Sequence, residues 1–166
     1  IAAAAIAEMA IGRIGDDTTV NVGQIEGGRA SNIVPDYCEV SGELRSFSHK
    51  KALEELAKVE QIFAKEAEKR GGSIEFIRDI CYQAYKTDEN ESVVKEFQKA
   101  CMACGIKSSL IATFGGSDQN KMSEHGIPGI VMASAMHQVH SCQEYTEVSE
   151  MAQVAGIVSE LLQMKE

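Results

Sequence analysis

The fold is decided by residues 18–47, TTVNVGQIEGGRASNIVPDYCEVSGELRSF, in which two strand patterns flank a pair of glycines. Residues 18–25 alternate apolar and polar side chains, which is typical of a strand with one buried face. Gly27 and Gly28 are expected to turn the chain, and a second strand is predicted over residues 33–47. The sequence therefore predicts two neighbouring strands joined through the glycine pair.

Helical patterns lie on both sides of these strands. The alanine-rich residues 1–12 are predicted as one helix. Ser48 is the expected N-cap of a second helix that ends at Arg70, before another pair of glycines. Residues 73–85, SIEFIRDICYQAY, are predicted as a third strand. This order makes up most of a ferredoxin-like βαββαβ unit, so its first strand is expected upstream of Ile1, in a longer protein of which the chain is a piece.

The pattern changes after Lys86, where the polar stretch KTDENES is expected to end the first unit. Helices then alternate with short apolar strands, and the predicted elements are a helix at 92–104, a strand at 108–114, a turn and helix at 115–126, a strand at 127–134 and a helix at 148–164. Such alternation indicates an α/β layer with parallel strands. About 80 residues form only part of such a layer, so other parts of the protein are expected to complete its sheet.

Charge and hydropathy exclude several kinds of partner. The 16 basic and 25 acidic residues give a formal net charge of −9. A nucleic-acid partner is therefore not expected, because binding phosphates requires a basic face. No apolar run approaches the ~20 residues of a membrane span, so no membrane partner is expected either. The first residues do not resemble a secretory signal, since they lack a basic region and include Glu8.

Five scattered cysteines indicate a reducing compartment. Their odd number, in a chain large enough for a core, argues against a disulfide framework and favours the cytoplasm. Cys101 and Cys104 form a CxxC motif, CMAC, which is open to a zinc or redox function. Packing of two small residues on one helix face is favoured, because no second CxxC or nearby Cys–His pair completes a tetrahedral set.

Three clusters on predicted loops could carry chemistry: GGRASNIVP at 27–35, GGSD at 115–118 and MHQVHSCQEY at 136–145. Each also has an ordinary structural explanation, namely a turn, a helix N-cap and a pair of surface histidines. Paired glycines before a helix let a ligand approach the backbone, where free N–H groups favour anions. A loop histidine near a carboxylate can bind a metal or act as a base.

The order of these clusters is more specific than any one of them. The chain carries FGGSDQN, HGIPGIV and VHSCQEYTEV, in that order, after a glycine-led N-I-V-P segment and a strand that ends in Leu-Arg. This series resembles the co-catalytic zinc metallopeptidase family of peptidase T, carboxypeptidase G and acetylornithine deacetylase, and within it the peptidase T-like branch. The resemblance covers nearly the whole chain.

The resemblance implies a division of the chain. Residues 1–86 would be a ferredoxin-like lid and dimerisation domain that lacks its first strand, and residues 87–166 the C-terminal part of the α/β catalytic domain. A homodimer through the lid is implied as well. An exposed strand edge in that domain would suit such pairing.

The resemblance also assigns residues. His140 would bind one of two zinc ions, with cobalt or manganese as alternative metals. Asn32 and Arg45 would contact substrate carbonyl or carboxylate groups from the closed lid. Gly115, Gly116 and Ser117 would receive the substrate backbone or its terminal carboxylate. Glu144 is expected to orient its loop and Asp118 to cap a helix, and no role is assigned to His137.

The family's other metal ligands, its general base and its oxyanion-stabilising histidine lie upstream of Ile1 by this resemblance. A lone His140 cannot hold zinc tightly, so the chain by itself is expected to be inactive. The implied activity of the parent protein is hydrolysis of short peptides from the N-terminus, as in a tripeptide aminopeptidase. Two alternatives stay open: a zinc-dependent deacylase of N-acyl amino acids, and a non-catalytic dimerisation or ligand-sensing module.

Overall fold

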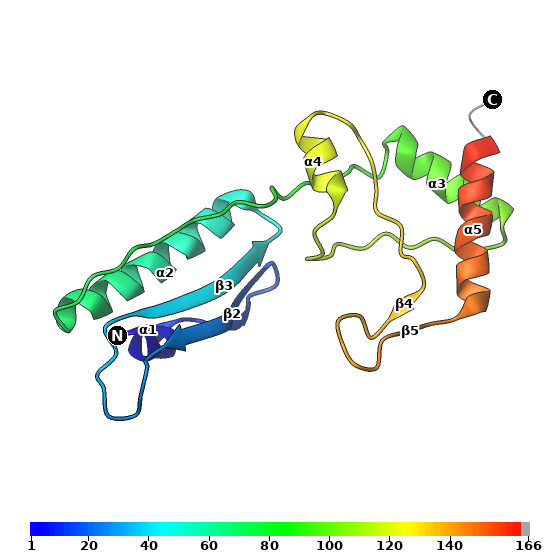
Figure 1. Ribbon diagram of the computed structural model, residues 1–166. Coiled ribbons are helices and arrows are strands. Elements are labelled where there is room, and N and C mark those ends of the chain that lie inside the picture. Colours follow the sequence, from blue (N-terminus) through cyan, green and yellow to red (C-terminus); the bar gives the residue numbers. More distant parts are fainter. Residues whose placement is uncertain (164–166) are drawn as a thin grey trace. The chain divides into compact units, whose positions relative to one another are not determined.

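The computed structural model describes residues 1–163 and divides the chain into two compact units. The first unit comprises Ile1–Ala84, and the second begins at Tyr85 (Figure 1). Each unit is described by itself below. Within the described residues, no helix is long and apolar enough to cross a membrane.

An antiparallel sheet forms the centre of the first unit. Its strands are β1 (Gly12–Ile14), β2 (Thr18–Gly27) and β3 (Cys38–Ser46), in the order β1-β2-β3. The prediction that β2 and β3 are neighbouring strands is confirmed. However, β3 begins five residues later than the sequence pattern suggested, because the loop that contains Pro35 precedes it. The short β1 was not predicted, since its three residues carry no alternation of their own.

Two glycines permit the close β2–β3 pairing. A Cβ atom at Gly42 would lie 2.7 Å from the Asn21 carbonyl oxygen, which is closer than a carbon atom tolerates. Gly28 has a φ of 87°, a conformation that glycine adopts without steric cost where the chain leaves β2. The hairpin therefore depends on glycine at its centre and at its turn.

Two helices pack in the first unit. They are α1 (Ala2–Glu8) and α2 (His49–Lys69), and α2 runs beside β3 in Figure 1. The core between these elements is small, with Ala5, Val20 and Ala67 as its buried apolar residues. The expected end of the first helix at residue 12 was wrong, since α1 already ends at Glu8. The following residues enter the β1–β2 hairpin instead.

The predicted caps of α2 are confirmed. The Ser48 hydroxyl accepts a hydrogen bond from the Lys51 N–H group (3.3 Å), as an N-cap residue does. At the other end Gly71 has a φ of 68°, and Gly72 N–H donates to the Ala67 carbonyl (2.9 Å). Cap chemistry is local, so it can be predicted from a few neighbouring residues.

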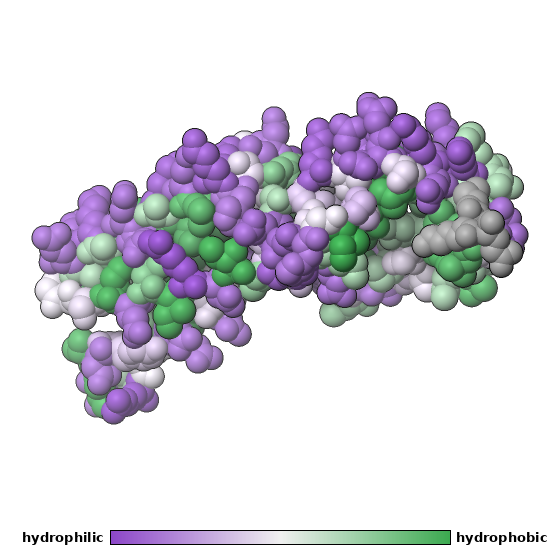
Figure 2. Space-filling view, turned by 90° about the horizontal axis from the view of Figure 1, so that it is seen from above, coloured by the Kyte–Doolittle hydropathy of each residue, from purple (hydrophilic) through white to green (hydrophobic). Residues whose placement is uncertain are grey.

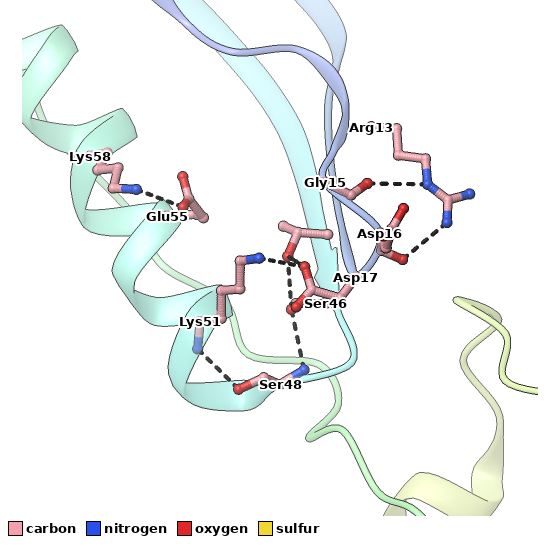
Figure 3. Close-up of polar contacts among 10 residues, drawn as sticks. Arg13, Gly15, Asp16, Asp17, Ser46, Ser48, Lys51, Glu55 and Lys58 are labelled. Atoms are coloured by element: carbon pink, nitrogen blue, oxygen red, sulfur yellow. Dashed lines mark hydrogen bonds and ion pairs between the residues drawn. The ribbon is translucent and has the colours of Figure 1, made fainter.

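A polar corner joins the start of α2 to the sheet (Figure 3). Lys51 donates to Asp17 across 2.5 Å, and Thr18 bonds to both Asp17 (3.1 Å) and Ser46 (3.0 Å). The bond from Lys51 lowers the pKa of Asp17 below its ordinary value, and the same contact raises the pKa of Lys51. The corner therefore fixes α2 to the β2 and β3 ends through charge as well as apolar packing.

A buried carboxylate lies near the end of α2. The Glu66 side chain is 1% exposed and pairs with Lys69 (3.2 Å) and with Arg70. Burial alone would raise the Glu66 pKa, but the hydrogen bond from Lys69 and the charge of Arg70 lower it overall. Glu66 is therefore held ionised by its two partners.

The predicted third strand at residues 73–85 is wrong. This segment follows α2 as extended backbone and pairs with no strand of the described chain (Figure 1). Arg78 of the segment forms an ion pair with Glu60 of α2, so a side-chain contact takes the place of a ladder. An apolar alternating pattern makes a segment suitable for a sheet, but a strand forms only beside a partner with free backbone groups.

The second unit contains three helices, α3 (Ser92–Ala103), α4 (Asp118–Glu124) and α5 (Val148–Gln163), and a two-residue pair formed by β4 (Met136–His137) and β5 (Tyr145–Thr146). Its core lies between α3 and α5, where Ala100, Cys101 and Ile157 are buried. The CxxC pair therefore belongs to this packing: Cys101 is 1% exposed, Cys104 contacts the cluster, and burial raises the pKa of the Cys101 thiol.

The predicted strands at residues 108–114 and 127–134 are wrong as well. Both segments are extended, and neither is paired as a strand with any described residue. Two side-chain hydrogen bonds hold the second segment: Thr87 donates to the Gly129 carbonyl (2.6 Å) and Gln119 donates to the Ile127 carbonyl (3.0 Å). Many apolar side chains stay exposed in both units, among them Val34, Ile77, Ile111 and Val131, and Figure 2 shows apolar patches interspersed with polar surface.

Candidate functional site

The segment from Ala135 through the loop between β4 and β5 has an unusual backbone. Ala135, Gln138 and His140 have φ angles of 61°, 50° and 64°, and these are the non-glycine residues of the described chain with positive φ. Left-handed backbone costs an ordinary residue roughly 1–2 kcal/mol. Such residues cluster where the surrounding structure holds a functional conformation in place. This loop is therefore the strongest candidate for a built site in the second unit.

Short hydrogen bonds fold the loop back on itself. Ser141 donates twice to the Gln138 carbonyl, from its N–H (3.2 Å) and from its hydroxyl (2.7 Å). Glu144 N–H then donates to the Ser141 carbonyl (3.2 Å). At the base of the loop, Thr146 donates to the Ala135 carbonyl (2.6 Å), beside the β4–β5 pair. Two successive turns thus bring the Glu144 side chain back to His140.

His137 is held from two sides. Its ring stacks on Tyr145 with the centroids 4.8 Å apart and the planes 15° from parallel. Its Nε2 atom lies 2.5 Å from a carboxylate oxygen of Glu150, in the first turn of α5. The sequence assigned no role to His137, and the structure shows it joining the loop to α5. The sequence could not predict the stacking of His137 on Tyr145, because the pairing of β4 with β5 is what brings these two residues into contact.

His140 is exposed and has a different environment. Its backbone N–H donates to a carboxylate oxygen of Glu144 (2.8 Å). No hydrogen bond or ion pair among residues 1–163 engages its imidazole. The Glu144 contact supports the expectation that this side chain orients the loop. A neutral imidazole presented from a held loop fits one metal ligand.

A complete metal centre requires further donors. Within residues 1–163, no three His, Cys, Asp or Glu side chains gather in a way that could hold a metal ion. The described residues therefore fit a metal only through the one ligand that His140 offers. Zinc centres use about three or four protein ligands, so His140 could contribute to such a site but not form it.

The GGSD loop enters α4 through a capping arrangement. Ser117 is the N-cap, and its N–H donates to the Asn120 side-chain oxygen (3.0 Å) in a capping box. The expectation that Asp118 caps this helix was wrong: Asp118 is the first helical residue, where its charge suits the helix N-terminus. Gly115 N–H donates to the Thr113 hydroxyl (3.1 Å), and both Gly115 and Gly116 are exposed. The paired glycines thus present accessible backbone beside the helix start.

The two predicted lid residues lie in the first unit. Asn32 is exposed in the loop between β2 and β3. Arg45 is half-buried on β3, where its Nε and Nη2 atoms contact the two carboxylate oxygens of Glu43 at 2.6 and 2.8 Å. This bidentate bond lowers the pKa of Glu43 and raises that of Arg45. Glu43 was missed in the sequence, although two residues of opposite charge at i and i+2 of a strand share one face.

The predicted site residues are divided between the two units. Gly115, Gly116, Ser117 and His140 all belong to the second unit, whereas Asn32 and Arg45 belong to the first. The residues that hold the His140 loop, namely Tyr145, Glu150 and Glu144, all follow His140 in the chain. The second unit therefore contains a candidate metal-ligand loop and a candidate backbone-binding loop.

Comparison with known proteins shows which proteins the chain is similar to. Residues 1–71 match the family described as the peptidase dimerisation domain, of the M20 type. Residues 1–71 are thus similar to an M20 peptidase dimerisation domain, and the predicted mixed α/β fold with similarity to the lid and dimerisation domain is confirmed.

Particular relatives extend the similarity over both units. The protein YqjE of Bacillus subtilis strain 168 is 33% identical over 163 residues, which are 98% of this chain and 44% of the relative. The aminopeptidase PepT from Bacillus cereus is 34% identical with a TM-score of 0.83, over 98% of this chain and 43% of that one. A tripeptidase from Staphylococcus aureus is 29% identical with a TM-score of 0.90, over 98% and 44%.

A more distant structure shares the fold alone. The YxeP protein of Bacillus subtilis, described as a dinuclear metal-binding peptidase of the M20 family, is 18% identical with a TM-score of 0.66. The match covers 87% of this chain and 41% of YxeP. The chain thus spans less than half the length of each of these relatives.

Proposed function

We propose that this chain is part of a zinc-dependent exopeptidase that hydrolyses short peptides, in the manner of a tripeptide aminopeptidase. One observation carries the proposal: nearly the whole chain follows the backbone of a PepT aminopeptidase and of a tripeptidase, with TM-scores of 0.83 and 0.90. In this proposal the held and exposed His140 would supply one metal ligand.

The proposal divides the roles between the units. Residues 1–86 form the lid and dimerisation domain, through which the protein forms a homodimer, and residues 87–166 form the C-terminal part of the catalytic domain. The dimer is supported by the family match of residues 1–71. A cytoplasmic setting is supported by the five cysteines, all of which are free.

In the proposed reaction, His140 would offer its imidazole as a ligand to one of two zinc ions. Bound zinc would supply polarisation of the scissile carbonyl and activation of water. Gly115, Gly116 and Ser117 would bind the peptide backbone or its terminal carboxylate, with the exposed backbone of the two glycines open to it. Asn32 would contribute an amide to a substrate carbonyl.

Arg45 requires an exchange of partners. Its guanidinium contacts both oxygens of Glu43, so a substrate carboxylate would compete with Glu43 for the same planar donor group. Both side chains are partly exposed, which makes such an exchange feasible in water. Arg45 would therefore bind the substrate carboxylate only after its ion pair with Glu43 breaks.

Deacylation of an N-acyl amino acid is the second candidate. An acyl-amide bond and a peptide bond have the same carbonyl and nitrogen, so the same residues could serve either reaction. The Arg45 guanidinium, a donor for one terminal carboxylate, suits an amino-acid product as well as a short peptide. A dimerisation or ligand-sensing protein without catalysis is the third possibility, which a lack of bound metal would support.

The test uses the full-length gene product, with zinc per chain and amino acid released from a tripeptide as readouts. We expect about two metal ions per active site and turnover, and we expect His140→Ala to reduce both. His125→Ala is the matched control, because His125 is an exposed histidine at the end of α4. Zinc without tripeptide turnover would favour the deacylase, and a protein with neither would refute the enzyme proposal.

A further inference from the structure

We propose that Glu144 is a positioning residue for the His140 imidazole, acting through the backbone and not as a metal ligand. The inference rests on the proposed function, in which His140 binds a metal. It goes further by naming the side chain that keeps this histidine in a binding conformation.

The geometry of the loop supports this role. The turns at Gln138–Ser141 and Ser141–Glu144 reverse the chain twice and return the Glu144 carboxylate to the His140 N–H group. Glu144 Oε2 then accepts from that N–H at 2.8 Å. Because the acceptor is ionised, this bond is stronger than a bond between neutral groups.

A held backbone matters at His140 because its conformation is otherwise unfavourable. With a φ of 64°, His140 would relax to the right-handed or extended region if nothing held it. Either change would rotate the Cα–Cβ bond and move the imidazole away from its present position. The Glu144 bond to the N–H group opposes that rotation directly, while the imidazole itself stays unengaged within residues 1–163.

The rest of the loop has its own anchors. His137 is fixed by the Tyr145 ring and the Glu150 carboxylate, and Thr146 bonds to the Ala135 carbonyl. None of these contacts involves the Glu144 side chain. Loss of the Glu144 carboxylate should therefore release His140 while leaving the base of the loop in place.

The experiment compares three variants of the full-length protein. Affinity for Zn²⁺ is measured by competition with a chromophoric chelator, and the visible spectrum of the Co²⁺-loaded protein reports the ligand set. Glu144→Ala removes the acceptor and should weaken Zn²⁺ binding by about 10- to 100-fold, as loss of a ligand-orienting contact does. Glu144→Gln keeps an acceptor oxygen and should restore most of the affinity, with an unchanged Co²⁺ spectrum.

Glu147→Ala is the matched control. It removes an exposed carboxylate three residues from Glu144 and changes the net charge equally, so it should bind Zn²⁺ like the wild type. Wild-type affinity in Glu144→Ala would overturn the proposal. Equal losses in Glu144→Gln and Glu144→Ala, with an altered Co²⁺ spectrum in both, would also overturn it, because they would make Glu144 a ligand.

His140→Ala separates this proposal from the function on which it rests. If His140→Ala weakens Zn²⁺ binding and Glu144→Ala does not, the positioning role fails and the metal site stands. If neither substitution affects Zn²⁺ binding, the proposed metal site itself fails. Should Glu144→Ala not fold, the Glu144→Gln spectrum and affinity still decide between an acceptor and a ligand.

Discussion

The β2–β3 hairpin of the first unit and the extended segments of the second unit have similar sequence patterns but different structures. Thr18–Gly27 and Cys38–Ser46 pair over nearly their full length. Residues 108–114 and 127–134 are at least as apolar, yet the structure pairs neither of them with any residue from 1 to 163. The difference teaches that a hairpin supplies its own partner through a short connection, whereas a parallel strand requires one from elsewhere.

The cores of the two units differ in the same way. In the first unit helices pack beside a sheet, and Ala5, Val20 and Ala67 are buried among them. In the second unit the core is a helix pair, in which Ala100, Cys101 and Ile157 join α3 to α5. Helices satisfy their own backbone hydrogen bonds, so a helix pair can form even where the intervening strands have no neighbours.

The largest expected effect concerns amide exchange in the 166-residue chain. Amides within the β2–β3 ladder should exchange roughly a thousandfold more slowly than amides of 108–114 and 127–134, because only the former are held in a ladder. Hydrogen exchange followed by NMR or mass spectrometry would measure this. Equal protection in all four segments would contradict the comparison, because it would require strand partners for the apolar segments.

The next effect tests whether the helix pair is the core of the second unit. Ile157→Ala should destabilise that unit by about 2–5 kcal/mol, since Ile157 is 5% exposed and packs on Ala100 and Cys101. Exchange of amides in α3 would report the loss. Val158→Ala, which truncates the exposed neighbouring residue, is the control and should cost far less. An equal cost in the two variants would place the core elsewhere.

Local features of both units could be predicted from the sequence. The Ser48 cap, the glycine end of α2 and the β2–β3 pairing depend on neighbouring residues, and each was confirmed. The predicted strands at 73–85, 108–114 and 127–134 were wrong. Their hydrophobic patterns show which side chains suit burial, but they do not show whether a neighbouring strand is present to accept and donate backbone hydrogen bonds. Pattern and pairing are separate requirements.

The candidate site shows the same limit. His140 stood out by residue type and motif order, and its role stays a prediction, but no pattern could show the left-handed backbone that presents it. The Glu144 contact depends on two turns whose conformations no short motif specifies. Arg45 was predicted as a substrate-binding residue without its Glu43 partner, although the i, i+2 spacing on a strand was visible. Residue types could thus be predicted more readily than their contacts.

The smallest effect concerns the polar corner, which belongs to the first unit alone (Figure 3). The hydrogen bond from Lys51 lowers the pKa of Asp17 below 3.8, so the folded state favours the ionised carboxylate. Its stabilisation is therefore present above pH ~3.8 and is lost as the pH falls through the lowered pKa. The contact with Asp17 raises the pKa of Lys51 above 10.5. The stabilisation that protonated Lys51 contributes to the folded state is therefore present below that pH and is lost as the pH rises through the raised pKa.

Asp17→Asn should remove this dependence. The variant should show a smaller fall in β2 amide protection than the wild type when the pH drops from about 5 to about 3, and the difference should shrink in high salt because both partners are partly exposed. Protection of α3 should be alike in the two proteins, since the corner lies outside the second unit. Asp16→Asn, which removes the exposed neighbouring carboxylate, is the control. If it altered the acid response as much as Asp17→Asn, general charge and not the Lys51 contact would account for the effect.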